Sequence, residues 1–442
     1  MLNWIFIVLI VGSAVAAAFR GTMAEVSAAS LASAKSAVDL AIGLVGQMAL
    51  WLGLMGVLRE AGLLRSLARG LEPLMRRLFP EVPADHPAMG AMVMNVAANV
   101  LGLGNAATPF GLKAMSELNK LNTHPGTATN AMALFLAINT SGVAVLPLGA
   151  VAVRAALGSH DPAGIIVPSI LATSLNTVAA VIVAKMLERL PAFAPGNAVL
   201  SEGSDAVTSA ATPDAMPAAM KEAEAAAAPH QPSKGIRRWI TLAVAVTLGI
   251  AAIQHGVVTA RTQAGLDVLR ALLSDWLLPS LIAAIVLFGF ARKVKVYEVF
   301  VASAKEGFQL AIAVIPFLVA ILVAIGMFRA SGAMDLLVTA IGRLTVPLGF
   351  PAEAVPMALI RSLSGSGALA VMTETMKTYG PDSFVGYLVS VINGTSETTF
   401  YVLAVYFGSV QVRATRHTVW ACLAADGAGI VAAAAVTHLW FG

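Results

Sequence analysis

The chain has 442 residues, of which 58% are hydrophobic and only 12% charged, and its mean hydropathy is +0.82. This composition excludes a water-soluble globule, which could not cover so much apolar side chain, and indicates a multi-pass protein whose main partner is the lipid bilayer. The net charge of +4 is modest and the Lys and Arg residues flank apolar segments, so we expect no nucleic-acid partner.

In the first half, long apolar segments bounded by Gly, Pro or charged residues predict membrane-spanning helices at residues 4–19, 38–58, 128–153 and 165–187. Residues 4–19 are short and end in small residues, as a secretory signal does. No basic segment precedes them, so we expect them to be retained as the first helix. Between residues 58 and 78, leucines at helical spacing alternate with arginines, which predicts a helix along the membrane interface.

Residues 88–110 are apolar enough to enter the membrane, yet they carry Asn95, Asn99 and Asn105 together with glycines. A helix facing lipid would not tolerate three amides and several helix breakers. We therefore expect either a re-entrant hairpin or a helix buried among others.

The composition changes at residues 191–234 to Ala, Pro, Ser, Glu and Asp without bulky apolar periodicity, which predicts a disordered linker. The predicted domains are a first half at 1–190, this linker, an extra span with its connection at 235–270, and a second half at 271–442. Apolar segments that follow the linker lie at 239–255, 276–290, 307–328, 383–410 and 418–440, with a Ser- and Gly-rich segment at 356–375.

An Ile-Asn pair followed by small polar residues interrupts one apolar stretch in each half, at 138–141 and 392–396. Other short matches follow in the same order in both halves, which indicates an internal duplication. Re-entrant hairpins would make the halves an inverted repeat, whereas full crossings would make them parallel. We favour an all-α polytopic membrane protein built as an inverted repeat, with re-entrant hairpins and broken transmembrane helices.

Polar side chains inside a bilayer are candidates for function, because a charge at mid-helix costs roughly 2.5 to 3.5 kcal/mol on insertion scales. The first-half candidates are amides and hydroxyls: Asn95, Asn99, Asn105, Asn139, Thr140 and Ser141. The second-half candidates include charges: Arg361, Ser362, Ser364, Ser366, Glu374, Asn393, Thr395, Ser396 and Glu397. We expect Arg361 to pair with Glu374 or Glu397, and Asp426 in the last span to couple a proton or sodium ion. Helix packing and interhelical hydrogen bonding are the alternative interpretation.

The first half resembles the spore maturation protein A family, through MVMNVAANVLGLGNAATPFGLKAM at 92–115. The second half resembles the spore maturation protein B family, through IRSLSGSGALAVMTE at 360–374 and INGTSETTFYVLAVYFG at 392–408. The chain thus resembles a fusion of two proteins that both carry a nucleoside recognition or gate domain. The resemblance implies a bacterial inner-membrane protein whose hairpins and unwound helices frame a solute path, and a role in spore maturation in spore formers.

These features favour a secondary transporter or exporter of a small polar solute across the cytoplasmic membrane, driven by an ion gradient. We expect no enzyme activity, no cofactor and no metal, since no His or Cys spacing suits a metal. A homo-oligomer is compatible with the sequence. The alternatives are a membrane scaffold or regulator of envelope or spore maturation that transports nothing, and an intramembrane enzyme, which would need a nucleophile and base facing one another.

Overall fold

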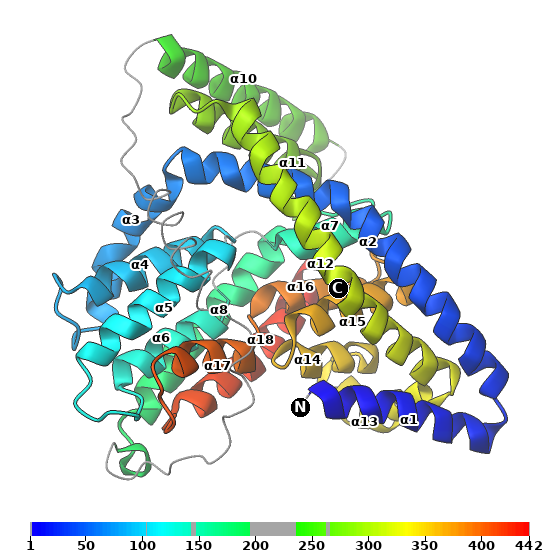
Figure 1. The fold of residues 1–442 in the computed structure, drawn as a ribbon. Coiled ribbons are helices and arrows are strands. Elements are labelled where there is room, and N and C mark those ends of the chain that lie inside the picture. Colours follow the sequence, from blue (N-terminus) through cyan, green and yellow to red (C-terminus); the bar gives the residue numbers. More distant parts are fainter. Residues whose placement is uncertain (1, 103, 143–146, 195–235, 262–265, 442) are drawn as a thin grey trace.

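A computed structural model describes residues 2–102, 104–142, 147–194, 236–261 and 266–441. Those residues are helical and contain no β-strand (Figure 1). The helices of the first half are α1 (Leu2–Arg20), α2 (Met23–Glu60), α3 (Leu63–Leu78), α4 (Pro87–Val100), α5 (Gly104–Lys120), α6 (Asn130–Thr140), α7 (Leu148–Ala156) and α8 (Ile166–Leu187).

The second half begins with α10 (Ile236–Thr259) and α11 (Leu266–Ala291). The remaining helices are α12 (Val296–Ala330), α13 (Ala333–Thr345), α14 (Val355–Arg361), α15 (Gly365–Tyr379), α16 (Phe384–Thr395), α17 (Thr399–Ser409) and α18 (Thr418–Phe441). Short 3₁₀ turns lie at η1 (Pro191–Phe193), η3 (Val346–Leu348) and η4 (Ala352–Ala354).

The two halves correspond element by element, α2 to α8 matching α12 to α18. The repeated part of each half, which leaves out α1, α10 and α11, opens with a helix of 35 residues or more, 38 in α2 and 35 in α12. A glycine in the left-handed region then turns the chain, with φ of 76° at Gly62 and 72° at Gly332. Five shorter helices follow, α3 to α7 in one half and α13 to α17 in the other, and the last helix in each half is again long, 22 residues in α8 and 24 in α18. The predicted duplication is confirmed.

The duplicated halves run in opposite senses. Helices α2 and α12 pack against one another. Gly56 near the end of α2 contacts Ser303 near the start of α12, and Gly326 near the end of α12 contacts Ser33 near the start of α2, so the two helices are antiparallel. Both glycines lie three residues before an arginine at the C-terminal end of their helix, so they are equivalent positions. In each half, therefore, the equivalent glycine contacts the equivalent serine of the other half, as a two-fold relation between the halves requires. The repeat is inverted.

Both polar hairpin segments form helix pairs. Residues 88–110 fall in α4 and α5, which pack on one another and are separated by a short break, so the hairpin is found and a single buried helix is not. The Ser- and Gly-rich segment divides in the same way into α14 and α15. Residues 63–78 form the predicted amphipathic helix α3; its place at the interface stays a prediction.

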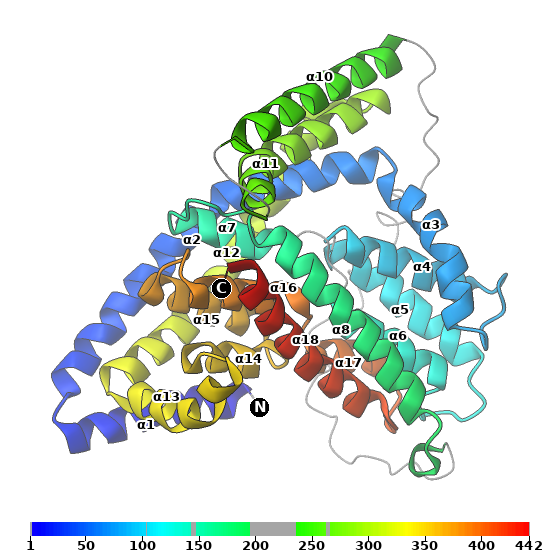
Figure 2. The ribbon, with the colours of Figure 1, turned by 180° about the vertical axis from the view of Figure 1, so that it is seen from behind.

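Among the described residues, four helices are long and apolar enough to span a membrane, namely α2, α8, Trp239–Thr259 of α10, and α18. The pair Leu318–Ala330 and Ala333–Arg343, bent by 77°, would make a fifth. A chain with several such helices is a multi-pass membrane protein. Helices α8 and α18 lie side by side in Figures 1 and 2. Both also pack against α6 and α16, so these four helices form one packed group.

The two long polar-interrupted spans are each divided in two, as α6 with α7 and as α16 with α17. Thr129 and Ser383 cap α6 and α16 in the same way, each hydroxyl accepting a backbone N–H three residues ahead. Pro147 precedes α7, where the missing N–H of proline is tolerated. Most of the predicted linker, residues 195–234, lies outside the described residues, whereas its start forms η1. The domain boundaries stay predictions.

Candidate binding site at the two helix breaks

The two breaks contact one another directly. The Glu397 N–H donates to the Thr140 carbonyl at 2.8 Å, which joins the start of one break to the other. Gly142 has a φ of 71°, and a Cβ there would lie 2.8 Å from Ser396 Cα. Only glycine suits that position, because both the left-handed conformation and the close approach exclude a side chain. Gly142 and Ser396 are equivalent in the two halves, so the pseudo-two-fold axis passes between them.

Helix α8 holds both breaks through one buried amide. Asn176 Nδ2 donates to the carbonyl of Ser141 at 3.2 Å and to that of Thr395 at 3.0 Å. These two carbonyls occupy equivalent positions in the repeat. Thr173, one turn earlier, donates to the carbonyls of Ser141 and Gly142 at 3.1 and 2.8 Å. The carbonyls released by unwinding thus find partners without water, as a membrane interior requires.

The first-half amides form a chain of hydrogen bonds. Asn95 is fully buried and donates to the Ala107 carbonyl at 2.7 Å and to the Tyr406 hydroxyl at 3.2 Å. Asn99 donates to Asn139 Oδ1 at 2.9 Å, and its contact with Asn95 Oδ1 is longer, at 3.5 Å. The predicted amides are therefore brought together, but they largely satisfy one another. The side chain of Asn105 lies outside the described residues.

The hydroxyls of the first break also have internal partners. Thr140 Oγ1 donates to the Ala137 carbonyl at 3.2 Å, and Ser141 Oγ to the Ile138 carbonyl at 2.8 Å. In the second break, Thr395 Oγ1 donates to the Val391 carbonyl at 2.6 Å. These hydroxyls bond back to carbonyls in the last turns of α6 and α16, a pattern that competes with the helical hydrogen bonds near the point where each helix ends.

The second break carries charge. Arg361 Nη2 lies 3.8 Å from Glu397 Oε2, with 9% of the arginine side chain exposed and 52% of the glutamate. The buried Asp426 carboxylate accepts a hydrogen bond from Thr399 at 2.8 Å, and Ser362 lies beside it. Of the two partners expected for Arg361, the structure selects Glu397. Glu374 instead pairs with Arg329 at 3.0 Å, so it lies outside the charged cluster at the second break.

Three polar groups in this second half keep hydrogen-bonding capacity. Arg361 Nε and Asp426 Oδ1 are buried and have no hydrogen-bond partner in the described structure. The Asn393 amide is partly exposed and has none among the described side chains and backbone, although its equivalent Asn139 is engaged. Each of these groups can still donate or accept a further hydrogen bond.

The serines of the second hairpin lie at the break between α14 and α15. Ser364 caps α15, its hydroxyl accepting the Gly367 N–H at 3.0 Å, and lies 3.4 Å from the Ser366 hydroxyl. The Ser362 carbonyl accepts the Phe400 N–H at 3.2 Å, which ties this hairpin to α17. Ser396 is buried where α16 ends. The hairpin and the second break therefore form one site.

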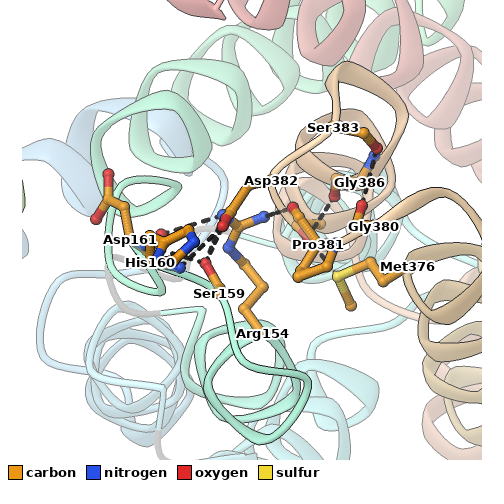
Figure 3. A network of polar contacts seen from close by, with 11 residues as sticks. Arg154, Ser159, His160, Asp161, Met376, Gly380, Pro381, Asp382, Ser383 and Gly386 are labelled. Atoms are coloured by element: carbon orange, nitrogen blue, oxygen red, sulfur yellow. Dashed lines mark hydrogen bonds and ion pairs between the residues drawn. The ribbon is translucent and has the colours of Figure 1, made fainter.

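A second polar network lies where the connection after α7 meets the turn before α16 (Figure 3). Arg154, fully buried, donates to Asp382 Oδ1 at 2.9 Å and to the Pro381 carbonyl at 2.5 Å. The Ser159 hydroxyl and His160 N–H also donate to Asp382, at 2.5 and 2.8 Å. Burial raises the pKa of Asp382, but these two hydrogen bonds and the Arg154 charge hold it below its ordinary value of 3.8.

The equivalent place in the other repeat is tied differently. The turn before α6 meets the connection after α17 through backbone bonds, including Ala128 N–H to the Ala414 carbonyl at 2.9 Å. Arg416 donates to the carbonyls of Ala128 and Phe193 at 2.9 and 2.7 Å. His417 is fully buried and neither of its ring nitrogens has a partner among the described residues. Burial, aided by the charges of Arg416 and Lys185, lowers the pKa of His417 from 6.5 to about 4.

Sequence reasoning missed Asn176, Thr173 and Tyr406, and also the pair Arg154 and Asp382. A lone Asn in the apolar stretch of α8 was a usable signal, because an amide in a membrane span needs a partner. The Arg154–Asp382 pair joins residues 228 apart and gave no local signal.

Comparison with known proteins places these features in a family. A model described as "Gate: Nucleoside recognition" matches residues 41–157 and 311–413, which include both breaks. Spore maturation protein A of Bacillus subtilis (strain 168) is 43% identical over 183 residues, 41% of this chain and 93% of that protein. Spore maturation protein B of the same organism is 45% identical over 170 residues, 38% of this chain and 96% of that protein.

The chain belongs to the nucleoside recognition, or Gate, family. Each of the two relatives matches a different half, so this Gate protein joins in one chain what B. subtilis has as two. The solved YdaH transporter of Alcanivorax borkumensis aligns with 100% of this chain and 97% of its own, at 13% identity and a TM-score of 0.37, a likeness too distant to use.

Proposed function

We propose that this protein is a secondary transporter of a small polar solute across the bacterial cytoplasmic membrane, coupled to a proton or sodium ion. The observation that carries the proposal is the contact between two unwound breaks at equivalent positions of an inverted repeat, both held by Asn176. Transporters with inverted repeats keep their sites where broken helices meet at the repeat interface.

The second break supplies the ligands in this proposal and the first break supplies support. Arg361, Asp426 and Asn393 keep unused hydrogen-bonding groups, whereas Asn95, Asn99 and Asn139 bond to protein. Asp426 is the coupling group, because a buried carboxylate beside an arginine can change its protonation when a solute arrives. No cofactor or enzymatic step is involved.

Uptake into proteoliposomes tests the proposal. The wild-type chain, reconstituted in vesicles with an imposed proton or sodium gradient, is offered a panel of labelled amino acids, nucleosides and small organic acids. We expect gradient-driven uptake of at least one compound and a clear loss of uptake in Asn393→Ala. The matched control Asn130→Ala removes an asparagine at the start of α6 and should transport as the wild type does. Equal uptake in Asn393→Ala and wild type would remove the break from the mechanism.

A second candidate function is a scaffold or regulator of envelope or spore maturation, favoured by the names of the two B. subtilis relatives. It differs in its expected outcome. Alanine at Asn393 or Arg361 would then change only stability or partner binding, and the correctly folded wild type would carry no member of the panel under either gradient.

A further inference from the structure

The site beside the second break contains two buried atoms of opposite character that lack partners. Arg361 is 7% exposed and Asp426 is 5% exposed. The Arg361 Nε donor and the Asp426 Oδ1 acceptor both lack a hydrogen bond in the described structure. A buried polar group without a partner is costly, and the cost is larger for a charged group. The pair therefore needs either each other or a ligand.

Arg361 and Asp426 attract one another, but they do not form an ion pair. Each charge acts on the other, yet the contact that Arg361 makes is with Glu397 Oε2, at 3.8 Å, longer than a hydrogen bond. Glu397 is half exposed, so water screens its charge. The guanidinium is thus buried between two carboxylates without a close hydrogen bond to either.

Charge balance selects the kind of ligand. Arg361 and Asp426 together are neutral, so an added anion would meet Asp426 unfavourably and an added cation would meet Arg361 unfavourably. Such a like-charge contact is more unfavourable in a buried site than in water, because the lower effective dielectric constant strengthens the repulsion. A ligand that carries both charges avoids both repulsions and satisfies both unpartnered atoms.

We propose that Arg361 and Asp426 bind a zwitterion, with its carboxylate or phosphate on Arg361 and its ammonium on Asp426. This inference rests on the proposed function and names its substrate class. The Ser362 and Thr399 hydroxyls lie beside the Asp426 carboxylate and complete the polar wall of the site. Gly365 allows Thr398 to pack closely against the start of α15, since a Cβ there would lie 2.9 Å from Thr398 Oγ1.

The same chemistry occurs in a free amino acid and in a phosphatidylethanolamine headgroup, so the test separates the two sources. The full chain is placed in nanodiscs of phosphatidylglycerol alone, which holds no zwitterionic lipid. Isothermal titration then measures L-alanine, γ-aminobutyrate, succinate, putrescine and urea. We expect a zwitterion to bind and the dianion, the dication and the neutral amide not to bind.

Variants tie the binding to the two side chains. Arg361→Gln and Asp426→Asn should each weaken zwitterion binding at least about tenfold. Arg329→Gln, which removes an arginine from the separate pair with Glu374, should leave binding unchanged. If Arg361→Gln does not fold, Arg361→Lys replaces it, because lysine keeps the charge and lacks the Nε donor.

If no free zwitterion binds, retention of phosphatidylethanolamine is measured by native mass spectrometry after reconstitution in mixed lipid. Retention that the two variants abolish would support a headgroup ligand. Absence of both forms of binding, or tighter binding of succinate, putrescine or urea, would overturn the proposal. Transport of another solute without zwitterion binding would support the proposed transport function and contradict the zwitterion site. Zwitterion binding without any flux would support the zwitterion site and contradict the transport function.

Discussion

The two ends of the inverted repeat close the same turn with different chemistry. At the Arg154 end, a buried arginine and several donors converge on the Asp382 carboxylate. At the Arg416 end, backbone hydrogen bonds make the closure, and arginine donates only to carbonyls. Helix α8 separates the two ends and, with 22 residues, is about 33 Å long, close to the roughly 30 Å of a bilayer core. We infer that the two ends lie at opposite membrane surfaces.

This difference shows that duplication conserved the backbone arrangement while the charges diverged. The end closed by an ion pair and the end closed by backbone bonds should therefore respond differently to mutation and to acid, whether or not they open in turn as the proposed transport function requires. Four predictions test that contrast.

The largest effect is expected from Arg154→Met. The substitution leaves the partly buried Asp382 carboxylate without its cation and removes the bond to the Pro381 carbonyl. Breaking a buried pair by removing one partner typically costs 3 to 5 kcal/mol, and Asp382 keeps its other donors, so we expect about 3 kcal/mol. Denaturant unfolding in detergent measures it; a loss below about 1 kcal/mol would contradict the structural role of the pair.

The second effect is acid sensitivity at the Arg416 end. Because the pKa of His417 is lowered to about 4 from 6.5, the unfolded chain binds the proton more readily than the folded chain. Stability is therefore complete above pH 6.5 and falls as the pH drops toward 4. With allowance for partial solvent screening we expect a loss of about 2 kcal/mol.

His417→Gln is the matched variant for this prediction, since glutamine does not titrate. Thermal unfolding between pH 7 and 4 should show a smaller decline in the variant than in the wild type. Parallel curves for the two proteins would mean that His417 does not sense pH.

Sequence reasoning could locate the breaks but not their partners. Apolar periodicity interrupted by Ile-Asn predicted both divided helices and the duplication, because those signals are local. The choice between Glu374 and Glu397 for Arg361 depended on how α15 and α17 pack, which spacing along the chain does not determine. The lone amide of Asn176 in α8 was a local signal, but its bond to the second break and the contacts at the Arg154 end could not be found locally, since they join residues more than 200 positions apart.

A smaller effect is expected from Arg416→Met, the counterpart of Arg154→Met. The variant loses two hydrogen bonds to carbonyls, while the backbone bonds between residues 126–128 and 413–414 remain. We expect about 1 kcal/mol, measured under the same conditions as for Arg154→Met. Equal losses in the two variants would show that the ends are equivalent in energy.

The smallest effect within the usable pH range concerns Asp382. Its folded pKa lies below the ordinary 3.8, so the stability it contributes is complete above pH 3.8 and is lost as the pH falls below that value through the lowered pKa. Between pH 7 and 4 the Arg154 end should therefore hold while the Arg416 end weakens. Hydrogen exchange of residues 157–161 and 124–128, followed across that range, compares the two ends directly. As the pH falls, protection should be lost first at residues 124–128. Earlier loss at residues 157–161 would contradict the prediction that the Arg416 end is the acid-sensitive one.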